Sequence, residues 1–333
     1  MSEPTLRALA PGKTNLGLFL GPTRSDGLHE LVTLIEPLSL ADELTLEELP
    51  GGALSAAAPG LDDAACAGGA DEVVCVGVEG PNLAATALER YRAASGWDGP
   101  PRRLTIVKRV PVAAGMGGGS GDAAAALRLA AHAAGRPDDP LIAQLAPQLG
   151  ADVPSQVSPA PVLVHGAGER VEQVLPPPSH WLLVLPSRER LATPEVFREA
   201  DRLGIGRTAQ ELLELRERLR GALDAAPVDA SAAARTLLPE LLVNDLEPAA
   251  RSLCPAIAPA LEAARDAGAD HAFVSGSGPT VIGLFWGEEG ERAARTGAER
   301  LRERFPGAVA ARPVAPDFAA VGVVRDNGAA HEQ

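Results

Sequence analysis

The stretch PVAAGMGGGSGDAAAALRLAAHAAG, residues 111–135, decides the fold. It runs from a proline-led turn through three consecutive glycines into an alanine-rich segment that predicts a helix. Three glycines in a row need a reason, because each loses more backbone freedom on folding than any other residue. With the preceding predicted strand RLTIVKRV (103–110), the order is strand, glycine loop, helix. This arrangement suits phosphate, since the first N–H groups of a helix lack partners and the helix dipole favours an anion there.

The glycine pattern differs from two well-known phosphate-binding fingerprints. It is neither GxxxxGK[ST] nor GxGxxG. The alternative to a phosphate-binding loop is a simple capped turn, in which Ser120 caps the helix and Asp122 complements its dipole. The alanines that follow favour binding, because small side chains let the helix N-terminus approach a neighbour without blocking the space in front of it.

The composition limits the class of protein. The chain has 333 residues, 46% hydrophobic and 22% charged, which is typical of a folded protein of two domains or one large α/β unit. A net charge of −14 argues against nucleic acid and membrane partners, so any bound anion must be recognised locally. No segment approaches the ~20 apolar residues of a membrane span, and the N-terminus does not resemble a signal peptide. Cys66, Cys75 and Cys254 match no metal spacing and favour a reducing, cytoplasmic setting.

Apolar runs on the N-terminal side predict strands at 16–21, 31–40 and 42–49. Residues 51–70 are small and glycine-rich and predict a loop or a weak hairpin. A helix closed by Gly96 precedes the strand at 103–110. Strands and helices follow without a regular βαβ alternation, so the expected class is α+β.

The glycine segment resembles the second motif of the GHMP small-molecule kinases, P-x3-G-[LM]-[GS]-[SG]-S-[SG]-[DA]-A-A, whose loop binds the phosphates of ATP. The triple glycine followed by S-x-D-A-A is most similar to the branch that phosphorylates the 2-hydroxyl of 4-diphosphocytidyl-2-C-methyl-D-erythritol in the non-mevalonate (MEP) isoprenoid pathway. Further segments are similar to that branch in the same order along the chain: APGKTNLGLFLG (10–21), RSDGLHELVTL (24–34), LGADVP (149–154), TPEVF (193–197), NDLEP (244–248) and FVSGSGPTVIGLF (273–285).

The resemblance implies a two-lobed α+β GHMP kinase fold. The N-terminal lobe, 1–175, would resemble domain 2 of ribosomal protein S5, and the C-terminal lobe, 176–320, would be ferredoxin-like. Residues 321–333 are expected to form a tail without fixed structure. ATP and Mg²⁺ would be the cofactors, a small alcohol the substrate, and the protein a monomer or homodimer.

Two residues would be catalytic by this resemblance. Asp152 would accept the proton of the substrate hydroxyl, and Lys13 would keep that carboxylate ionised and lower the pKa of the hydroxyl. Taken alone, Asp152 predicts a helix cap. Only Lys13 and Lys108 among 30 basic residues are lysine, so the choice of a compact ammonium in the first motif indicates a tight site. Lys108 is expected to have a solvated head.

The remaining predicted site residues would bind either the alcohol substrate or ATP. Asn15 would bind the methylerythritol part and His29 the cytosine edge, while Thr193 would add a hydroxyl contact and Phe197 an aromatic face. Outside the motifs, a lone histidine is usually structural, and Phe197 would suit the core face of an amphipathic helix. Ser120 is the expected Mg²⁺ ligand. ATP would be bound by Pro111, Ala113, Ala114, Gly115, Met116, Gly117, Gly118, Gly119, Ser120 and Gly121, supported by the third glycine motif Ser275, Gly276, Ser277 and Gly278.

Three departures from the family pattern keep alternatives open. Leu28 replaces the tyrosine of DGYHEL, which removes one aromatic face worth roughly 1–3 kcal/mol per stacked base. Gly12 makes the first motif PGK rather than PAK, and Gly121 stands where serine is usual. One alternative is a kinase for another small alcohol, such as homoserine or mevalonate. The other is a non-catalytic protein of the same fold that binds nucleotide or metabolite.

Overall fold

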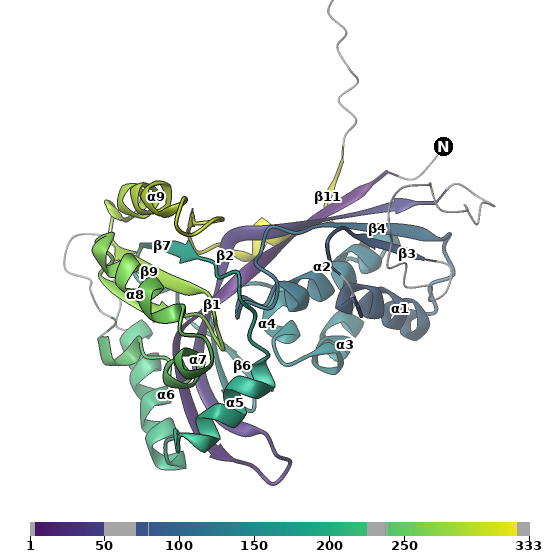
Figure 1. Ribbon diagram of the computed structural model, residues 1–333. Helices are drawn as coiled ribbons and strands as arrows, with labels where there is room; N and C mark the ends of the chain where they lie inside the picture. Colours follow the sequence, from purple (N-terminus) through teal and green to yellow (C-terminus); the bar gives the residue numbers. More distant parts are fainter. Residues whose placement is uncertain (1–3, 50–70, 79, 225–236, 238, 325–333) are drawn as a thin grey trace, which may run out of the picture.

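The computed structural model describes residues 4–49, 71–78, 80–224, 237 and 239–324, arranged as two lobes (Figure 1). The sheet of the first lobe has the order β11-β1-β2-β4-β3, and β5 extends it from β2 and β6 from β5. Its strands are β1 (Leu6–Thr23), β2 (His29–Glu48), β3 (Glu72–Cys75), β4 (Arg102–Val107), β5 (Val162–Gly166), β6 (Arg170–Gln173) and β11 (Gly322–Val323). The expected loop at 51–70 lies outside the described residues.

The second sheet is antiparallel and has the order β10-β7-β9-β8. Its strands are β7 (His180–Leu185), β8 (His271–Val274), β9 (Val281–Trp286) and β10 (Val309–Ala311). Helices separate β7 from β8 and β9 from β10, which is the β-α-β-β-α-β order of a ferredoxin-like lobe. The α+β class and the ferredoxin-like second lobe are therefore confirmed.

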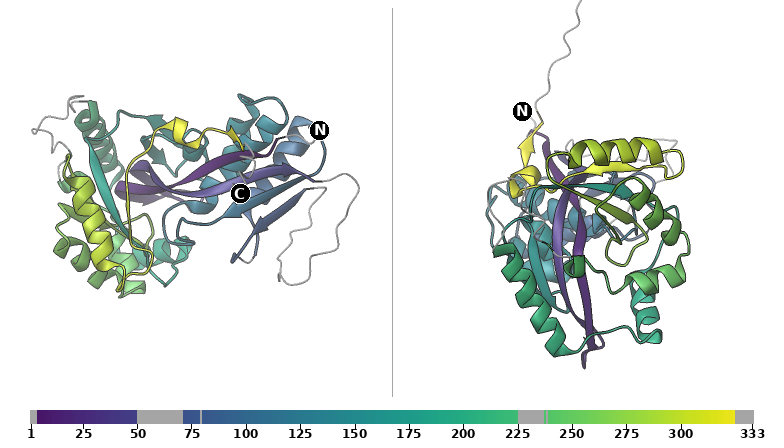
Figure 2. Two further views of the ribbon diagram at one scale, coloured as in Figure 1. Left: turned by 90° about the horizontal axis from the view of Figure 1, so that it is seen from above. Right: turned by 90° about the vertical axis from the view of Figure 1, so that its left-hand side faces the viewer.

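The helices fall into two groups (Figure 2). The blue helices of the first lobe and the green to yellow helices of the second lie on opposite sides of the molecule, and the long purple strands pass between them. The helices are α1 (Leu83–Ser95), α2 (Gly118–Ala133), α3 (Leu141–Leu149), α4 (Val153–Val157), α5 (Thr193–Arg202), α6 (Ala209–Asp224), α7 (Glu247–Leu253), α8 (Ile257–Asp266) and α9 (Gly290–Leu301), with short 3-10 turns at Pro239–Leu241 and Pro316–Ala319. No helix among these described residues is long and apolar enough to cross a bilayer.

Strands β1 and β2 form one long antiparallel hairpin. The expectation of separate strands at 31–40 and 42–49 is wrong, because β2 continues without a break from His29 to Glu48. It changes partners along its length: Leu31–Ile35 pair with β5, and Glu43–Glu48 pair with β4. The apolar runs were read correctly as extended backbone, but the point between them is a change of neighbour and not a turn.

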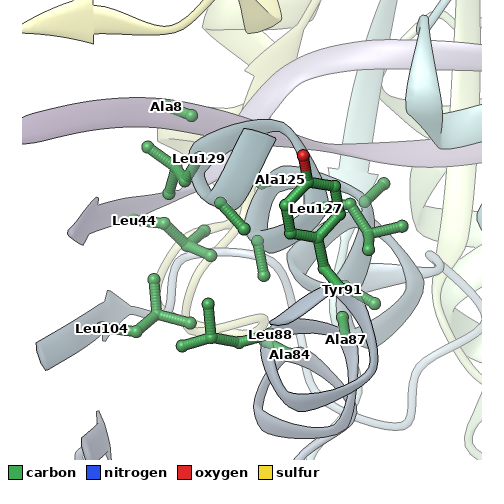
Figure 3. Close-up of a cluster of buried hydrophobic side chains, with 14 of the residues drawn as sticks. Ala8, Leu44, Ala84, Ala87, Leu88, Tyr91, Leu104, Ala125, Leu127 and Leu129 are labelled. Carbon is green, nitrogen blue, oxygen red and sulfur yellow. The ribbon is translucent and has the colours of Figure 1, made fainter. Parts of the chain in front are cut away.

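The core of the first lobe packs α1 and α2 against the sheet (Figure 3). Alanines fill the sheet-facing side of α2, and Ala123, Ala124 and Ala125 are fully buried. Leu44 of β2, Leu88 and the Tyr91 ring lie in the same cluster. Helix α1 ends as expected at Gly96, whose φ of 64° is left-handed. Small residues on α2 let its N-terminus come close to β1, which positions the glycine loop.

The chain returns to the first lobe at its C-terminal end. After β10, Pro313 bridges to Leu38, and Gly322 and Val323 pair with Arg7 and Leu6. The expectation of a tail without structure from residue 321 is therefore wrong for these residues, since the open edge of β1 accepts them as β11. Residues 325–333 lie outside the described part. The division of the chain at 175 stays a prediction.

Candidate active site

The glycine loop between β4 and α2 needs its glycines for two separate reasons. Gly115 has φ of 78°, and a Cβ there would lie 2.0 Å from the carbonyl oxygen of Ser275. Gly117 has φ of 65°, and its Cβ would lie 2.9 Å from Lys13 Cγ. Both are left-handed positions where a side chain is strained. The loop therefore packs its backbone directly against the third glycine motif and against Lys13.

The loop leaves a run of backbone amides without protein acceptors. Within the described residues, no acceptor is found for the N–H groups from Met116 to Ser120. The first occupied amide is that of Gly121, which donates to the Gly117 carbonyl at 2.9 Å. A Cβ on Gly119 would meet no atom within 4 Å, so the backbone there faces open space. Free donors at a helix N-terminus form a site for an anion.

Gly117 to Ser120, which carry four of these amides, line a cavity of about 650 Å³ between the two lobes. Most predicted site residues line it; the exceptions are His29 and four buried residues, Met116, Gly121, Ser275 and Gly278. Gly121 thus does not line the cavity, and its amide is occupied by the helix. The predicted residues along the cavity wall are Lys13, Asn15, Pro111, Ala113, Ala114, Gly115, Gly117, Gly118, Gly119, Ser120, Asp152, Thr193, Phe197, Gly276 and Ser277.

Lys13 and Asp152 meet in this cavity. Lys13 Nζ lies 3.6 Å from Asp152 Oδ2, and their side chains are 7% and 41% exposed. Asp152 precedes α4 as its N-cap residue, but its side chain makes no capping hydrogen bond. The helix-cap alternative therefore does not explain the carboxylate. The buried ammonium thus contacts a carboxylate that is itself open to the cavity, where it can accept a proton from a bound hydroxyl.

A chain of hydrogen bonds holds Lys13 in place. Lys13 Nζ donates to Asn15 Oδ1 at 2.8 Å, and Asn15 Nδ2 donates to Thr33 Oγ1 at 2.8 Å. Thr33 donates in turn to the Gly17 carbonyl at 2.7 Å. This chain fixes the amide of Asn15 with its oxygen toward the ammonium. Sequence reasoning included Thr33 in the segment RSDGLHELVTL but gave it no role, because a threonine inside a predicted strand gives no local signal of one.

Lys108 is not solvated, contrary to expectation. Its Nζ lies 2.5 Å from Asp42 Oδ2 and 2.6 Å from Asp122 Oδ2, and it lines the same cavity. Burial opposes the charge of Lys108, but Asp122 and Asp42 outweigh it, so its pKa is raised. Burial raises the pKa of Asp122 to about 7, against the opposing effect of Lys108. The partners come from β2 and α2, so only the fold brings them together.

Two of the predicted substrate-binding residues, Thr193 and Phe197, line the cavity from α5 of the second lobe. Thr193 Oγ1 and Ser277 Oγ lie 3.0 Å apart and connect the start of α5 to the third glycine motif. The rings of Phe197 and His29 are 5.2 Å apart and tilted by 48°. Phe197 lines the cavity; His29 is not among the lining residues, but its ring lies next to that of Phe197. Leu28 is 55% exposed beside them.

Comparison with known proteins agrees with this geometry. Residues 82–162 match the family model of the GHMP kinases N terminal domain, and residues 228–307 match that of the GHMP kinases C terminal. A homoserine kinase from Cytophaga hutchinsonii superposes with a TM-score of 0.61 over 97% of this chain and 98% of its own, at 16% identity, and shows the fold alone. The fold and the two matched domains define the class of this protein, which is a GHMP kinase.

More similar relatives narrow the family. A 4-diphosphocytidyl-2-C-methyl-D-erythritol kinase of Anaeromyxobacter dehalogenans is 37% identical over 92% of this chain and 88% of its own length. One from Streptomyces coelicolor is 39% identical over 82% and 85%. A crystal structure of 4-(cytidine 5'-diphospho)-2C-methyl-D-erythritol kinase is 32% identical, with a TM-score of 0.69 over 93% of this chain and 100% of the other. The chain belongs to the 4-diphosphocytidyl-2-C-methyl-D-erythritol kinase family.

Proposed function

We propose that this chain transfers the γ-phosphate of ATP to the tertiary 2-hydroxyl of 4-diphosphocytidyl-2-C-methyl-D-erythritol. The observation that carries the proposal is the placement of Lys13 and Asp152, 3.6 Å apart, in the cavity that the free amides of the glycine loop also face. Family membership supports the choice of acceptor. The geometry of the cavity supports the reaction class, because it offers an anion site and a proton acceptor side by side.

Each step can be assigned to groups of this chain. The amides from Met116 to Ser120 would bind the polyphosphate and hold the γ-phosphate in line with the hydroxyl. Asp152 would accept the hydroxyl proton as the oxygen attacks phosphorus. Lys13 would stabilise the negative charge that develops on the transferring group. Asn15, held by Thr33, would orient the alcohol next to this pair.

Mg²⁺ fits this cavity as an ion bound mainly by ATP. The described residues contain no cluster of three or more His, Cys, Asp or Glu side chains that could hold a metal. Mg²⁺ keeps most of its waters and binds nucleotide phosphates with few protein ligands. Ser120 on the cavity wall would be the protein ligand. The ion would neutralise charge on the β- and γ-phosphates.

The cytidyl end of the substrate would lie along α5. Phe197 offers its ring to the base, and His29 offers its edge next to that ring. Thr193 would reach the diphosphate or the ribose from the start of the helix.

We further propose a cytoplasmic location and a monomeric or homodimeric state; the free thiols of Cys75 and Cys254 suit a reducing compartment.

The decisive test is a panel of alcohols incubated with γ-labelled ATP. The panel contains 4-diphosphocytidyl-2-C-methyl-D-erythritol, homoserine and mevalonate, and transfer of label is measured by chromatography. We expect Mg²⁺-dependent label in the cytidyl alcohol alone. Transfer to homoserine or mevalonate but not to the cytidyl alcohol contradicts the acceptor assignment. ATP binding with no transfer to any alcohol contradicts kinase activity itself.

A further inference from the structure

Helix α5 places the carboxylate of Asp201 against the His29 ring. Asp201 Oδ1 lies 2.7 Å from His29 Nε2, and Thr23 Oγ1 lies 3.2 Å from the same nitrogen. Asp201 follows Phe197 by one helical turn, so both side chains lie on the same face of α5. His29 begins β2 in the first lobe, whereas α5 follows β7 of the second, and Figure 1 shows the helix beside the β1–β2 hairpin. The contact is therefore made between lobes.

The contact decides which ring nitrogen carries a proton. An ionised carboxylate only accepts hydrogen bonds, so His29 Nε2 must donate to Asp201. In the neutral ring the other nitrogen, Nδ1, is then an acceptor. Among the described residues no hydrogen bond to Nδ1 is found, so the acceptor capacity of this nitrogen is not used by them.

We propose that Asp201 is a positioning residue that makes His29 Nδ1 an acceptor for the exocyclic amine of a cytosine base. This rests on the proposed function, in which His29 meets that base. Cytosine presents an N4 amine as donor, whereas uracil presents an oxygen acceptor at the same place. If uracil bound in place of cytosine, its oxygen and His29 Nδ1 would both be hydrogen-bond acceptors, with no proton between them. The site therefore discriminates against uracil.

The hydrogen bond between Asp201 and His29 has a simpler interpretation, in which it only holds α5 against the β1–β2 hairpin. Other contacts already anchor the helix: Glu199 accepts from Ser252 Oγ of α7 at 2.6 Å, and Thr193 contacts Ser277 at 3.0 Å. Val196 and Ala200 are fully buried in the second lobe. Replacing Asp201 by its uncharged isostere should therefore leave α5 in place, which makes the two interpretations separable.

The test compares wild type with Asp201→Asn, using cytidine 5′-diphosphate and uridine 5′-diphosphate as probes in calorimetry. Glu195→Gln is the matched control, because Glu195 is exposed on the same helix. We expect wild type and Glu195→Gln to bind the cytidine nucleotide about 10- to 100-fold more tightly than the uridine nucleotide. In Asp201→Asn the amide can donate to Nε2, and the ratio should fall to ~3-fold or less. An unchanged ratio in Asp201→Asn overturns the proposal.

A second readout needs no substrate. Long-range ¹⁵N–¹H spectra of the imidazoles, with His29→Gln used for assignment, report which nitrogen is protonated. We expect a protonated Nε2 in wild type and a shift toward protonated Nδ1 in Asp201→Asn. A protonated Nδ1 in the neutral wild-type ring overturns the proposal. Failure to phosphorylate the cytidyl alcohol contradicts the proposed function instead, and the nucleotide ratio and the ring spectrum still decide the role of Asp201.

Discussion

The ammonium of Lys13 lies between two oxygens, 2.8 Å from Asn15 Oδ1 and 3.6 Å from Asp152 Oδ2. Asn15 lies on the same strand as Lys13, β1, whereas Asp152 is the N-cap residue of α4, so the site forms only when sheet and helices pack together. Lys13 is nearly buried, whereas Asp152 is open to the cavity. This asymmetry suits a fixed cation that supports a carboxylate able to exchange a proton.

Lys13→Arg should lose nearly as much activity as Lys13→Met. Two glycines leave little room around the Lys13 side chain: a Cβ on Gly276 would lie 3.3 Å from Nζ, and one on Gly117 would lie 2.9 Å from Cγ. A planar guanidinium is larger than an ammonium and cannot replace it in so tight a site. We expect kcat for the two variants to agree within about tenfold, both far below wild type. Recovery of wild-type kcat in Lys13→Arg would show that positive charge alone is enough.

Two glycines of the loop should respond oppositely to alanine. Gly115→Ala forces a left-handed alanine, at a cost of about 1–2 kcal/mol before the clash with the Ser275 carbonyl is counted, so the free energy of unfolding should fall. Gly119→Ala places a methyl group in open space and should stabilise α2 by ~1 kcal/mol. The KM for ATP should rise in Gly119→Ala, because the methyl group obstructs the phosphates. Urea unfolding and steady-state kinetics measure both effects; an unchanged ATP KM in Gly119→Ala would contradict binding at this loop.

ATP binding should weaken as pH rises through about 7, where the buried Asp122 carboxyl loses its proton. Above this pH, Lys108 faces two carboxylates, and the added negative charge lies in the cavity that takes the polyphosphate. Asp122→Asn should flatten the pH profile of the ATP KM relative to wild type between pH 6 and 8. The exposed Asp138→Asn serves as control.

The same carboxyl should shape the pH dependence of stability. Its pKa in the folded protein is raised from 3.8 to about 7, so folding favours the protonated form. The contribution of Asp122 to stability is therefore greatest below the unfolded value and is lost as pH rises toward 7. Urea unfolding should show a smaller decline between pH 4 and 7 in Asp122→Asn than in wild type. Equal declines would mean that Asp122 is already ionised across this range.

Leu28→Tyr should tighten binding of the cytidyl substrate. Leu28 is 55% exposed beside His29, at the position where the family pattern has tyrosine. A second aromatic face next to Phe197 should lower the KM for the cytidyl alcohol by about 5- to 10-fold, near the lower end of the stacking scale. The KM for ATP should stay unchanged and serves as the internal control. A KM for the cytidyl alcohol that stays constant or rises would mean that the base does not lie against this residue.

Local patterns predicted much of the fold and the loop. The glycine segment and the helix end at Gly96 were both visible in the sequence, because turn and cap chemistry acts between near neighbours. The pairing of Lys108 with Asp42 and Asp122 was not visible, since strand and helix partners meet only in the folded lobe. The contact of Asp201 with His29 depends on the placement of one lobe against the other.

The central claim is that Asp152 accepts the hydroxyl proton while the free loop amides bind ATP. The most direct measurement is single-turnover phosphorylation of the cytidyl alcohol by Asp152→Asn, alongside ATP affinity by calorimetry. The account predicts a rate about 10²- to 10⁴-fold below wild type, with the dissociation constant for ATP nearly unchanged. A near-normal phosphoryl-transfer rate in Asp152→Asn, or an equal loss of ATP binding, would contradict it.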